Sequence, residues 1–180
     1  MSTPMKKAQF REGNVPPGSV CLSSFVSLND GRNILVGKVA KPEVWVEKFF
    51  VGEQYAPKIA SSGKYVLPAS HLAWYESPLQ AAERVIKEQT LLPVPKGLKL
   101  TGVQSYVSGD PSDTQNPPHW DICFVYEAKL PKTAAKKLKS PEWFEDFGLK
   151  PRSKLTADDF TRGHGEILES SGLIGKKRKS

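Results

Sequence analysis

The sequence is poor in the residues that build covalent or metal-bound scaffolds, with two cysteines, three histidines and two methionines among 180 residues. Cys21 and Cys123 lie far apart in apolar stretches and lack the close spacing of a structural zinc site. This argues against a disulfide-rich secreted domain, and we expect two reduced core cysteines. No apolar run approaches the about 20 residues of a membrane span, and the N-terminus has no apolar signal segment. These absences predict a cytoplasmic protein that has no membrane partner.

Acidic residues are also fewer than basic ones. The sequence has 19 aspartates and glutamates and 26 lysines and arginines, which gives a net charge of +7. A basic balance favours partners that carry phosphate or another anionic surface. A solvated surface with a basic tail would explain the same excess. The length predicts one domain with a sizeable core. We place that domain at residues 19–170, after a flexible N-terminal arm at 1–18 and before a basic C-terminal tail at 171–180.

Several stretches predict strands. Residues 19–28 and 33–39 flank Asn29-Asp30-Gly31, a pattern typical of a β-hairpin. Residues 98–107 and 119–130 predict two further strands, and apolar residues alternate with Asp121, Cys123 and Glu127 along the second of them. The aromatic run at residues 44–51 is strand-like too. Its aromatic side chains suit either a core or a surface that stacks on a base.

The C-terminal part predicts shorter elements. Glu142-Trp143-Phe144 suggests a last short strand, and residues 156–170 suggest a helix that begins at Thr156 and bends around Gly163-His164-Gly165. His164 has no evident catalytic or metal partner, so we interpret it as structural. Two aspartates of the loop at residues 108–118 favour turns over a metal-ligand role.

The most informative helix follows Glu76 and covers residues 78–91. Ser77 is suited to cap its start, and proline is tolerated in the first turn. Apolar residues recur at helical spacing and predict one buried stripe, formed by Ala81, Ala82, Val85 and Ile86. Arg84 and Glu88 stand four positions apart, so their side chains can pair on the helix surface.

Residues 70–92 resemble the Nudix box, G-x5-E-x7-R-E-U-x-E-E-x-G-U, the signature of the Nudix hydrolase superfamily, where U is a bulky aliphatic residue. Glu76 matches the first glutamate, Arg84 the arginine and Glu88 the first acid of the E-E pair. The preceding L-P-A-S-H-L, residues 67–72, resembles the L-P-G-G-H-U loop of the family. The resemblance implies the Nudix fold, an α/β (α+β) architecture with a mixed β-sheet sandwiched between helices.

The departures from the box concern its chemistry. The family has glutamates at the positions of Val85 and Gln89, four residues apart, where two carboxylates would share one helix face. Magnesium prefers such hard oxygen ligands, whereas valine offers no ligand atom and glutamine only a neutral amide. Ser70 and Leu91 replace two box glycines. We therefore expect Glu76 and Arg84 to act as scaffold residues that join the loop to the helix.

The resemblance leaves two functions open. The first is a protein that binds a nucleotide or nucleic-acid phosphate with little or no hydrolysis and no firm cofactor. The alternative is an active magnesium-dependent pyrophosphohydrolase of a nucleoside diphosphate linked to another moiety. Its metal and catalytic groups would be Glu88, aided by Glu127 as a ligand or by Glu142 as a catalytic acid or base. On either reading, we expect the double change of Val85 and Gln89 to glutamate to raise metal affinity.

Phosphate binding has its own candidates. Two lysine-rich segments could contact a nucleic-acid backbone, RNA more readily than DNA, or could be solvated surface. They comprise Lys132, Lys136, Lys137 and Lys139 in one segment and Lys176, Lys177, Arg178 and Lys179 in the tail. A protein-interaction scaffold or a homodimer stays open as a third reading, without support from particular residues.

Overall fold

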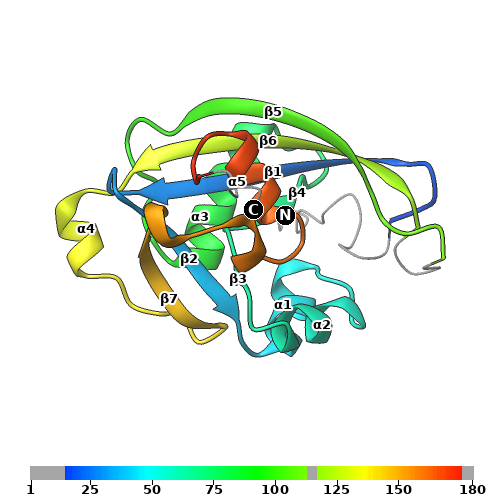
Figure 1. Cartoon of the computed structure of the whole chain (residues 1–180), viewed down its shortest axis with the longest axis horizontal. Coiled ribbons are helices and arrows are strands. Elements are labelled where there is room, and N and C mark those ends of the chain that lie inside the picture. The colour runs from blue at the N-terminus through cyan, green and yellow to red at the C-terminus, as the bar shows by residue number, and fades with distance from the viewer. Residues whose placement is uncertain (1–14, 113–116, 176–180) are drawn as a thin grey trace, which may run out of the picture.

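The computed structural model describes residues 15–112 and 117–175. Its centre is a mixed sheet in which β1 runs antiparallel to β2 and parallel to β6, and β5 pairs antiparallel with the outer side of β6 (Figure 1). Three shorter or outer strands complete the sheet, since β4 pairs with β1 while β3 and β7 pair with β2. The bounds are β1 Val20–Asn29, β2 Asn33–Val39, β3 Tyr65–Val66, β4 Ala69–His71, β5 Lys99–Ser108, β6 His119–Lys129 and β7 Phe144–Pro151.

The turn between β1 and β2 confirms the predicted hairpin. Gly31 has a φ of 100°, a backbone conformation that side chains disfavour. The Asn29 side chain accepts a hydrogen bond from the Gly31 backbone N–H at 2.9 Å. Asp30 accepts from the backbone N–H groups of Arg32 and Asn33 at 2.9 and 2.8 Å. Short polar side chains thus fix the turn locally.

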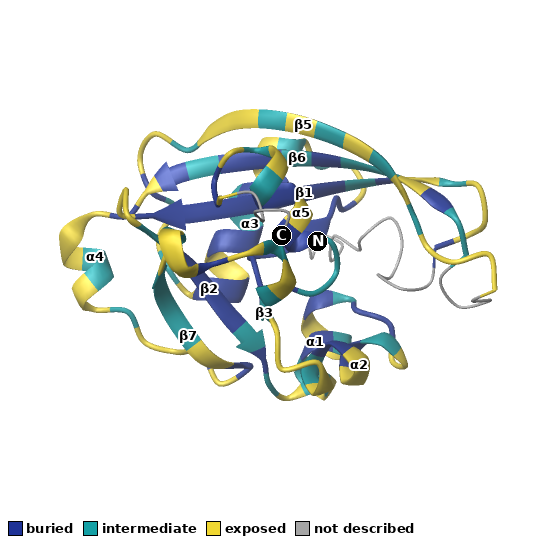
Figure 2. Cartoon of the chain, viewed as in Figure 1, coloured by how far each residue is buried: buried dark blue, intermediate teal, exposed yellow. Residues whose placement is uncertain are grey.

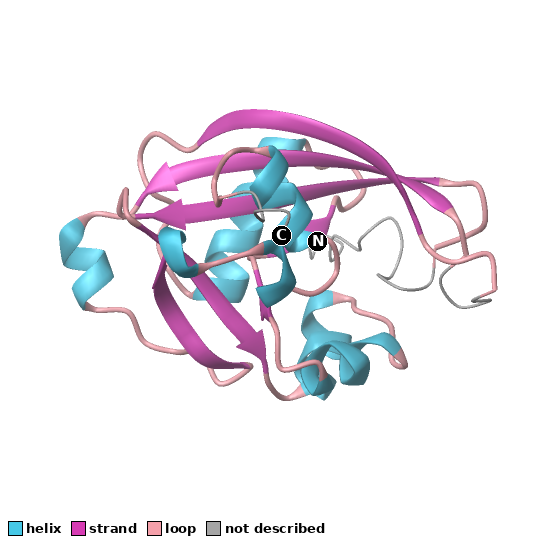
Figure 3. Cartoon of the chain, in the orientation of Figure 1, coloured by secondary structure: helices cyan, strands magenta, loops and turns pink. Residues whose placement is uncertain are grey.

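Helices cover both faces of the sheet (Figures 1 and 3). Helix α3 (Pro78–Thr90) packs on one face, where Ala82, Val85 and Ile86 meet β1 and β6 residues such as Val26 and Tyr126. Helix α5 (His164–Ser170) covers the other face, where its residues pack with neighbouring strand residues including Phe25, Cys123 and Val125. Figure 2 shows the central strands buried between these layers. The predicted architecture, a mixed sheet between helices, is confirmed.

The strand expected at residues 44–51 is wrong, because most of this stretch forms helix α1 (Pro42–Phe49), followed by α2 (Tyr55–Ser61). Pro42 stands in the first turn, where a missing N–H is tolerated. Trp45 and Phe49, four residues apart, are buried on one side, while Glu47 and Lys48 are exposed. A short apolar run fits either a strand or a buried helix face, and here packing decided for the helix.

The C-terminal helix expected at residues 156–170 is split. A 3-10 turn, η2 (Ala157–Asp159), begins with a capping box between Thr156 and Asp159, and α5 starts only at His164. Gly165 lies so close to Ala157 that an added Cβ would come within 2.3 Å of the Ala157 carbonyl oxygen. His164 is buried, and its Nδ1 accepts a hydrogen bond from the Leu67 N–H at 2.9 Å. These contacts explain the break around Gly163-His164-Gly165.

Three further segments differ from simple loops. The lysine-rich segment forms the short helix α4 (Lys132–Lys136), and η1 (Arg152–Lys154) follows β7. At the end of the N-terminal arm, Val15 is buried and the Gly18 N–H donates to the Pro118 carbonyl at 2.9 Å. In the part of the chain that the structure describes, no helix is long and apolar enough to span a bilayer.

Candidate functional site

The start of α3 follows from its own sequence. The Ser77 hydroxyl accepts from the Gln80 N–H at 3.2 Å, and the Gln80 side chain accepts from the Ser77 N–H at 2.9 Å. This reciprocal capping satisfies two backbone donors at the end of the helix. The helix ends at Thr90, and Leu91 adopts a left-handed conformation with a φ of 57°. That conformation costs a side-chain-bearing residue about 1–2 kcal/mol, which accounts for the glycine of the box pattern at this position.

Glu76 and Arg84 form the predicted link between loop and helix. Arg84 Nε and Nη2 donate to the two carboxylate oxygens of Glu76 at 2.8 and 2.9 Å. Arg84 Nη2 also donates to the His71 carbonyl at 3.0 Å, and Glu76 accepts from the Ala73 N–H at 2.9 Å. Burial acts to lower the pKa of Arg84, but the hydrogen bond and charge of Glu76 outweigh it and raise the pKa. The paired geometry confirms the register of the box.

Val85 occupies the position where the box pattern has its first helix acid. Its side chain is fully buried, as is that of Ile86, and both pack against β1 in the cluster that holds Val26 and Leu28. A ligand at this position would therefore lie inside the apolar core between α3 and the sheet. The expected burial of Ile86 is confirmed. Val85 is a core residue at a position where the box pattern has a glutamate.

Gln89 takes a specific structural role in place of the second acid. Its Nε2 donates to the Ala69 carbonyl at 2.8 Å, and its Oε1 accepts from the Ala69 N–H at 3.1 Å. The side chain is buried, and the Gln89 backbone carbonyl accepts from Trp143 Nε1 at 2.9 Å. A carboxylate could not donate to the Ala69 carbonyl. The neutral amide therefore fits this position, since it ties α3 to β4 through both of its polar atoms.

Glu88 is the one box acid left on the helix. Its side chain is 49% exposed, and its Oε2 lies 3.6 Å from Arg84 Nη1. Burial raises the pKa of Glu88, and the charge of Arg84 opposes that rise. Magnesium bound by protein carboxylates needs several oxygen ligands in octahedral geometry. With Val85 buried and Gln89 bonded to backbone, the residues of this helix do not fit the magnesium site that the resemblance implies.

The two distant candidates do not complete such a site. Glu127 lies on β6 in register with Ser27, on the same face as Val125 and therefore opposite to α3, so its side chain does not point toward the box helix. Its Oε1 accepts from Asn29 and Arg152 at 2.8 and 3.1 Å. Glu142 is exposed at the surface and pairs with Lys41 at 2.6 Å. The Lys41 hydrogen bond lowers the pKa of Glu142.

Helix α4 stands at one end of the molecule (Figures 1 and 2), and lysines are concentrated in and just after it. The four predicted lysines, Lys132, Lys136, Lys137 and Lys139, are all solvent-accessible there. Two hollows of ≈ 320 and ≈ 310 Å³ share Lys96 and Lys129 in their walls. Ala134 of α4 lines the larger hollow, and Glu127 lines the smaller one. The larger hollow is also lined by Leu92 and Pro93, directly after α3. The tail candidates Lys176, Lys177, Arg178 and Lys179 lie outside the described residues.

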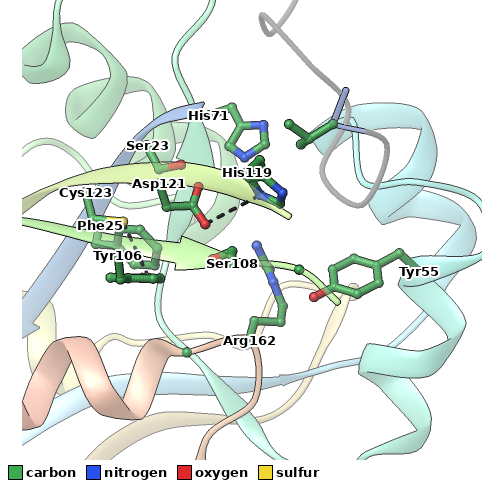
Figure 4. A pocket seen from close by; sticks show the side chains of 13 residues that line it. Ser23, Phe25, Tyr55, His71, Tyr106, Ser108, His119, Asp121, Cys123 and Arg162 are labelled. Carbon is green, nitrogen blue, oxygen red and sulfur yellow. Dashed lines mark hydrogen bonds and ion pairs between the residues drawn. The ribbon is translucent and has the colours of Figure 1, made fainter. Parts of the chain in front are cut away.

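A cavity of ≈ 230 Å³ opens on the other face of the sheet, beside α5 (Figure 4). Its walls carry His71 from β4 and His119 and Asp121 from β6, with Arg162 reaching toward them from the segment before α5. Burial lowers the pKa of Arg162, although a guanidinium stays charged at neutral pH. No sequence pattern identifies this group. The alternation along β6 is visible in the sequence, but the approach of β4 is not.

Cys21 lies next to this cavity and is buried. Burial, together with the charge of Asp121, raises the pKa of its thiol to about 12. Cys123 is also buried, and its sulfur lies 3.5 Å from the Tyr106 hydroxyl. Both cysteines are free. A protonated, buried thiol is a poor nucleophile, so the cavity does not offer a cysteine nucleophile.

No protein-family model matches the sequence, and no curated protein matches it significantly. Solved structures do match. The MutT protein from Methanosarcina mazei Go1 has 12% identity and a TM-score of 0.56 over 88% of this chain and 97% of that one. The mMutator MutT protein from Bacillus halodurans has 18% identity and a TM-score of 0.53 over 83% and 80%.

A third match, a mutT/nudix family protein from Listeria innocua, has 19% identity and a TM-score of 0.51 over 88% of this chain and 94% of that one. Identities this low establish a shared fold and leave activity open. The paired Glu76 and Arg84 and the buried Ile86 agree with that fold at the level of the box. The chain therefore has the Nudix fold, with a box that keeps its scaffold residues and lacks two of its acids.

Proposed function

We propose that this chain binds the phosphate groups of a nucleotide or nucleic acid, with little or no hydrolysis at its box helix. The observation that carries the proposal is the Gln89 side chain, whose oxygen and nitrogen are both hydrogen-bonded to the backbone of Ala69. The second acid of the box is thus replaced by a group that the fold itself uses. Val85 is buried at the first acid position, so a shared metal site has no ligands there.

The lysine surface around α4 supports the binding half of the proposal. Proteins that bind nucleic-acid phosphates do so largely through solvent-exposed lysine and arginine side chains. Lys96 and Lys129 stand in the walls of both hollows, and Pro131 and Ala134, which flank the exposed Lys132 in sequence, line the larger one. The larger hollow lies beside Leu92 and Pro93, just after α3, so a helix with fewer acids carries less charge that would repel a phosphate there.

Binding is tested by the salt dependence of affinity for a short single-stranded RNA, measured by fluorescence anisotropy. The double change Lys132→Gln with Lys136→Gln should weaken binding and lower the slope of log K against log salt by about 0.7 for each phosphate that the variant no longer neutralises. A matched control is Lys58→Gln with Lys64→Gln, which removes the same charge from exposed positions in and just after α2. Equal weakening in both variants, or no binding by the unmodified chain at about 50 mM salt, would refute the lysine surface. Single-stranded DNA and free nucleotides in the same assay define the ligand class.

Hydrolysis is tested separately. The purified chain should release phosphate or mononucleotide from ADP-ribose, dinucleoside polyphosphates and nucleoside triphosphates no faster than a heat-treated sample, with magnesium or manganese present. The reason is that Glu88, half exposed and paired with Arg84, lacks partner ligands on its helix. Metal-dependent turnover that Glu88→Gln abolishes would instead establish an enzyme with a rearranged site.

A further inference from the structure

We infer that the face of the sheet opposite the box helix holds a transition-metal site, formed by Cys21, His71 and Asp121 with His119 beside them. The preferred ion is Zn²⁺. This site is separate from the positions of the box acids, and it does not depend on the phosphate-binding proposal. Sulfur, imidazole nitrogen and carboxylate oxygen together suit zinc and similar divalent ions, whereas magnesium and calcium prefer oxygen ligands alone.

The strand register brings the three ligands together. Cys21 and Asp121 are direct partners across the parallel pair β1 and β6. On the other side of β1, His71 is the direct partner of Ser23, two residues after Cys21 and on the same face of the strand. One ligand atom from each of the three side chains lies within 4.8 Å of the other two. Three adjacent backbones therefore fix the group.

The separation of these atoms is close to what one ion requires. Zinc bonds measure about 2.0–2.3 Å at tetrahedral angles, so two ligands of one ion lie about 3.3–3.8 Å apart, and the three side chains would close slightly around it. Cys21 and His71 are buried and Asp121 is 15% exposed. A cation seated among them would be shielded from bulk water, while the neighbouring cavity leaves one side open to a small ligand.

His119 provides a second, independent observation. Its Nδ1 lies 2.7 Å from the Pro117 carbonyl oxygen, and because a carbonyl can only accept, Nδ1 carries a proton. His119 Nε2 lies 3.6 Å from Asp121 Oδ2 (Figure 4). His119 is outside the three-residue cluster whose atoms could share one ion. Its ring therefore stands beside the site as a group that orients the Asp121 ligand.

The chain also supplies a matched control. Cys123 is a second buried cysteine on the same face of the sheet, two residues from Asp121, and it does not belong to the cluster. Its sulfur contacts Tyr106 instead. Replacing either cysteine by serine removes one buried thiol from this face, but only the change at Cys21 removes a ligand.

The experiment uses the full chain without an affinity tag, treated with a chelator and then titrated with Co²⁺ and Zn²⁺. Cobalt should bind one ion per chain, displace the proton of the Cys21 thiol and produce the near-ultraviolet absorption of a cobalt–thiolate bond, and one equivalent of zinc should displace the cobalt. Cys21→Ser should abolish the thiolate band while Cys123→Ser retains it. His119→Gln should weaken zinc affinity at least tenfold, and Asp121→Asn should do the same.

Circular dichroism and thermal unfolding of each chelator-treated variant check that the fold is intact, and zinc should raise the melting temperature of the unmodified chain but not that of Cys21→Ser. Failure of the chelator-treated, folded chain to bind either ion would overturn the inference. A thiolate band that survives in Cys21→Ser and vanishes in Cys123→Ser would overturn the ligand assignment.

Discussion

Val85→Glu is expected to lower the free energy of unfolding by about 3–5 kcal/mol, the usual cost of an uncompensated buried charge. The Val85 side chain is fully buried among Val26, Leu28 and Ile86, and the cluster that surrounds it consists of hydrophobic residues. A glutamate at position 85 would therefore destabilise the core rather than provide a metal ligand. The sequence-based expectation that glutamates at Val85 and Gln89 raise metal affinity is replaced by this one.

The measurement is urea unfolding followed by tryptophan fluorescence at two pH values. Apolar surroundings raise the pKa of a buried carboxyl group above its unfolded value of about 4.3. The part of the destabilisation that comes from ionisation is therefore complete above the raised pKa and fades as the pH falls toward about 4.3. Lys87→Glu, at an exposed position of the same helix, should change stability by less than about 0.5 kcal/mol. A Val85→Glu variant as stable as this control would contradict the packing of α3.

Arg84→Met is expected to cost about 3–5 kcal/mol of stability, because it leaves a buried carboxylate without its counter-charge. The Glu76 side chain is only 2% exposed, and two of its hydrogen bonds come from Arg84. The Ala73 N–H would still donate to Glu76, but a neutral backbone donor does not replace the positive charge of the guanidinium. The loop before α3 should therefore become less ordered, because the unpaired Glu76 carboxylate is more stable when hydrated.

A second variant separates the effect of the charge from that of arginine packing. Adding Glu76→Gln to Arg84→Met removes the unpaired negative charge of Glu76, so the double variant should unfold at a higher urea concentration than Arg84→Met alone. Arg32→Met, at an exposed position of the hairpin turn, serves as the control and should stay within about 0.5 kcal/mol of the unmodified chain. If the single and double variants unfold together, the link between Glu76 and Arg84 is not what stabilises the loop.

Local sequence was informative wherever short-range contacts decide the structure. The hairpin at Asn29-Asp30-Gly31, the capping of α3 by Ser77 and the register of Glu76 with Arg84 all depend on residues within ten positions of one another. Turn preferences, helix caps and helical periodicity act at this range. The aromatic run in α1 was ambiguous, because its burial depends on the distant Trp143, whose carbonyl accepts from Trp45.

The sequence by itself determined the helix register, the hairpin and the replacement of acids at Val85 and Gln89. Only the tertiary structure decided what those replacements do, because the partner of Gln89 is the backbone of Ala69, twenty residues away on β4. It also decided that Cys21, His71 and Asp121 meet, since three strands from distant parts of the chain must pair in one register to place them. A shift of one residue would turn every side chain of a strand to the other face, and no local pattern fixes that register.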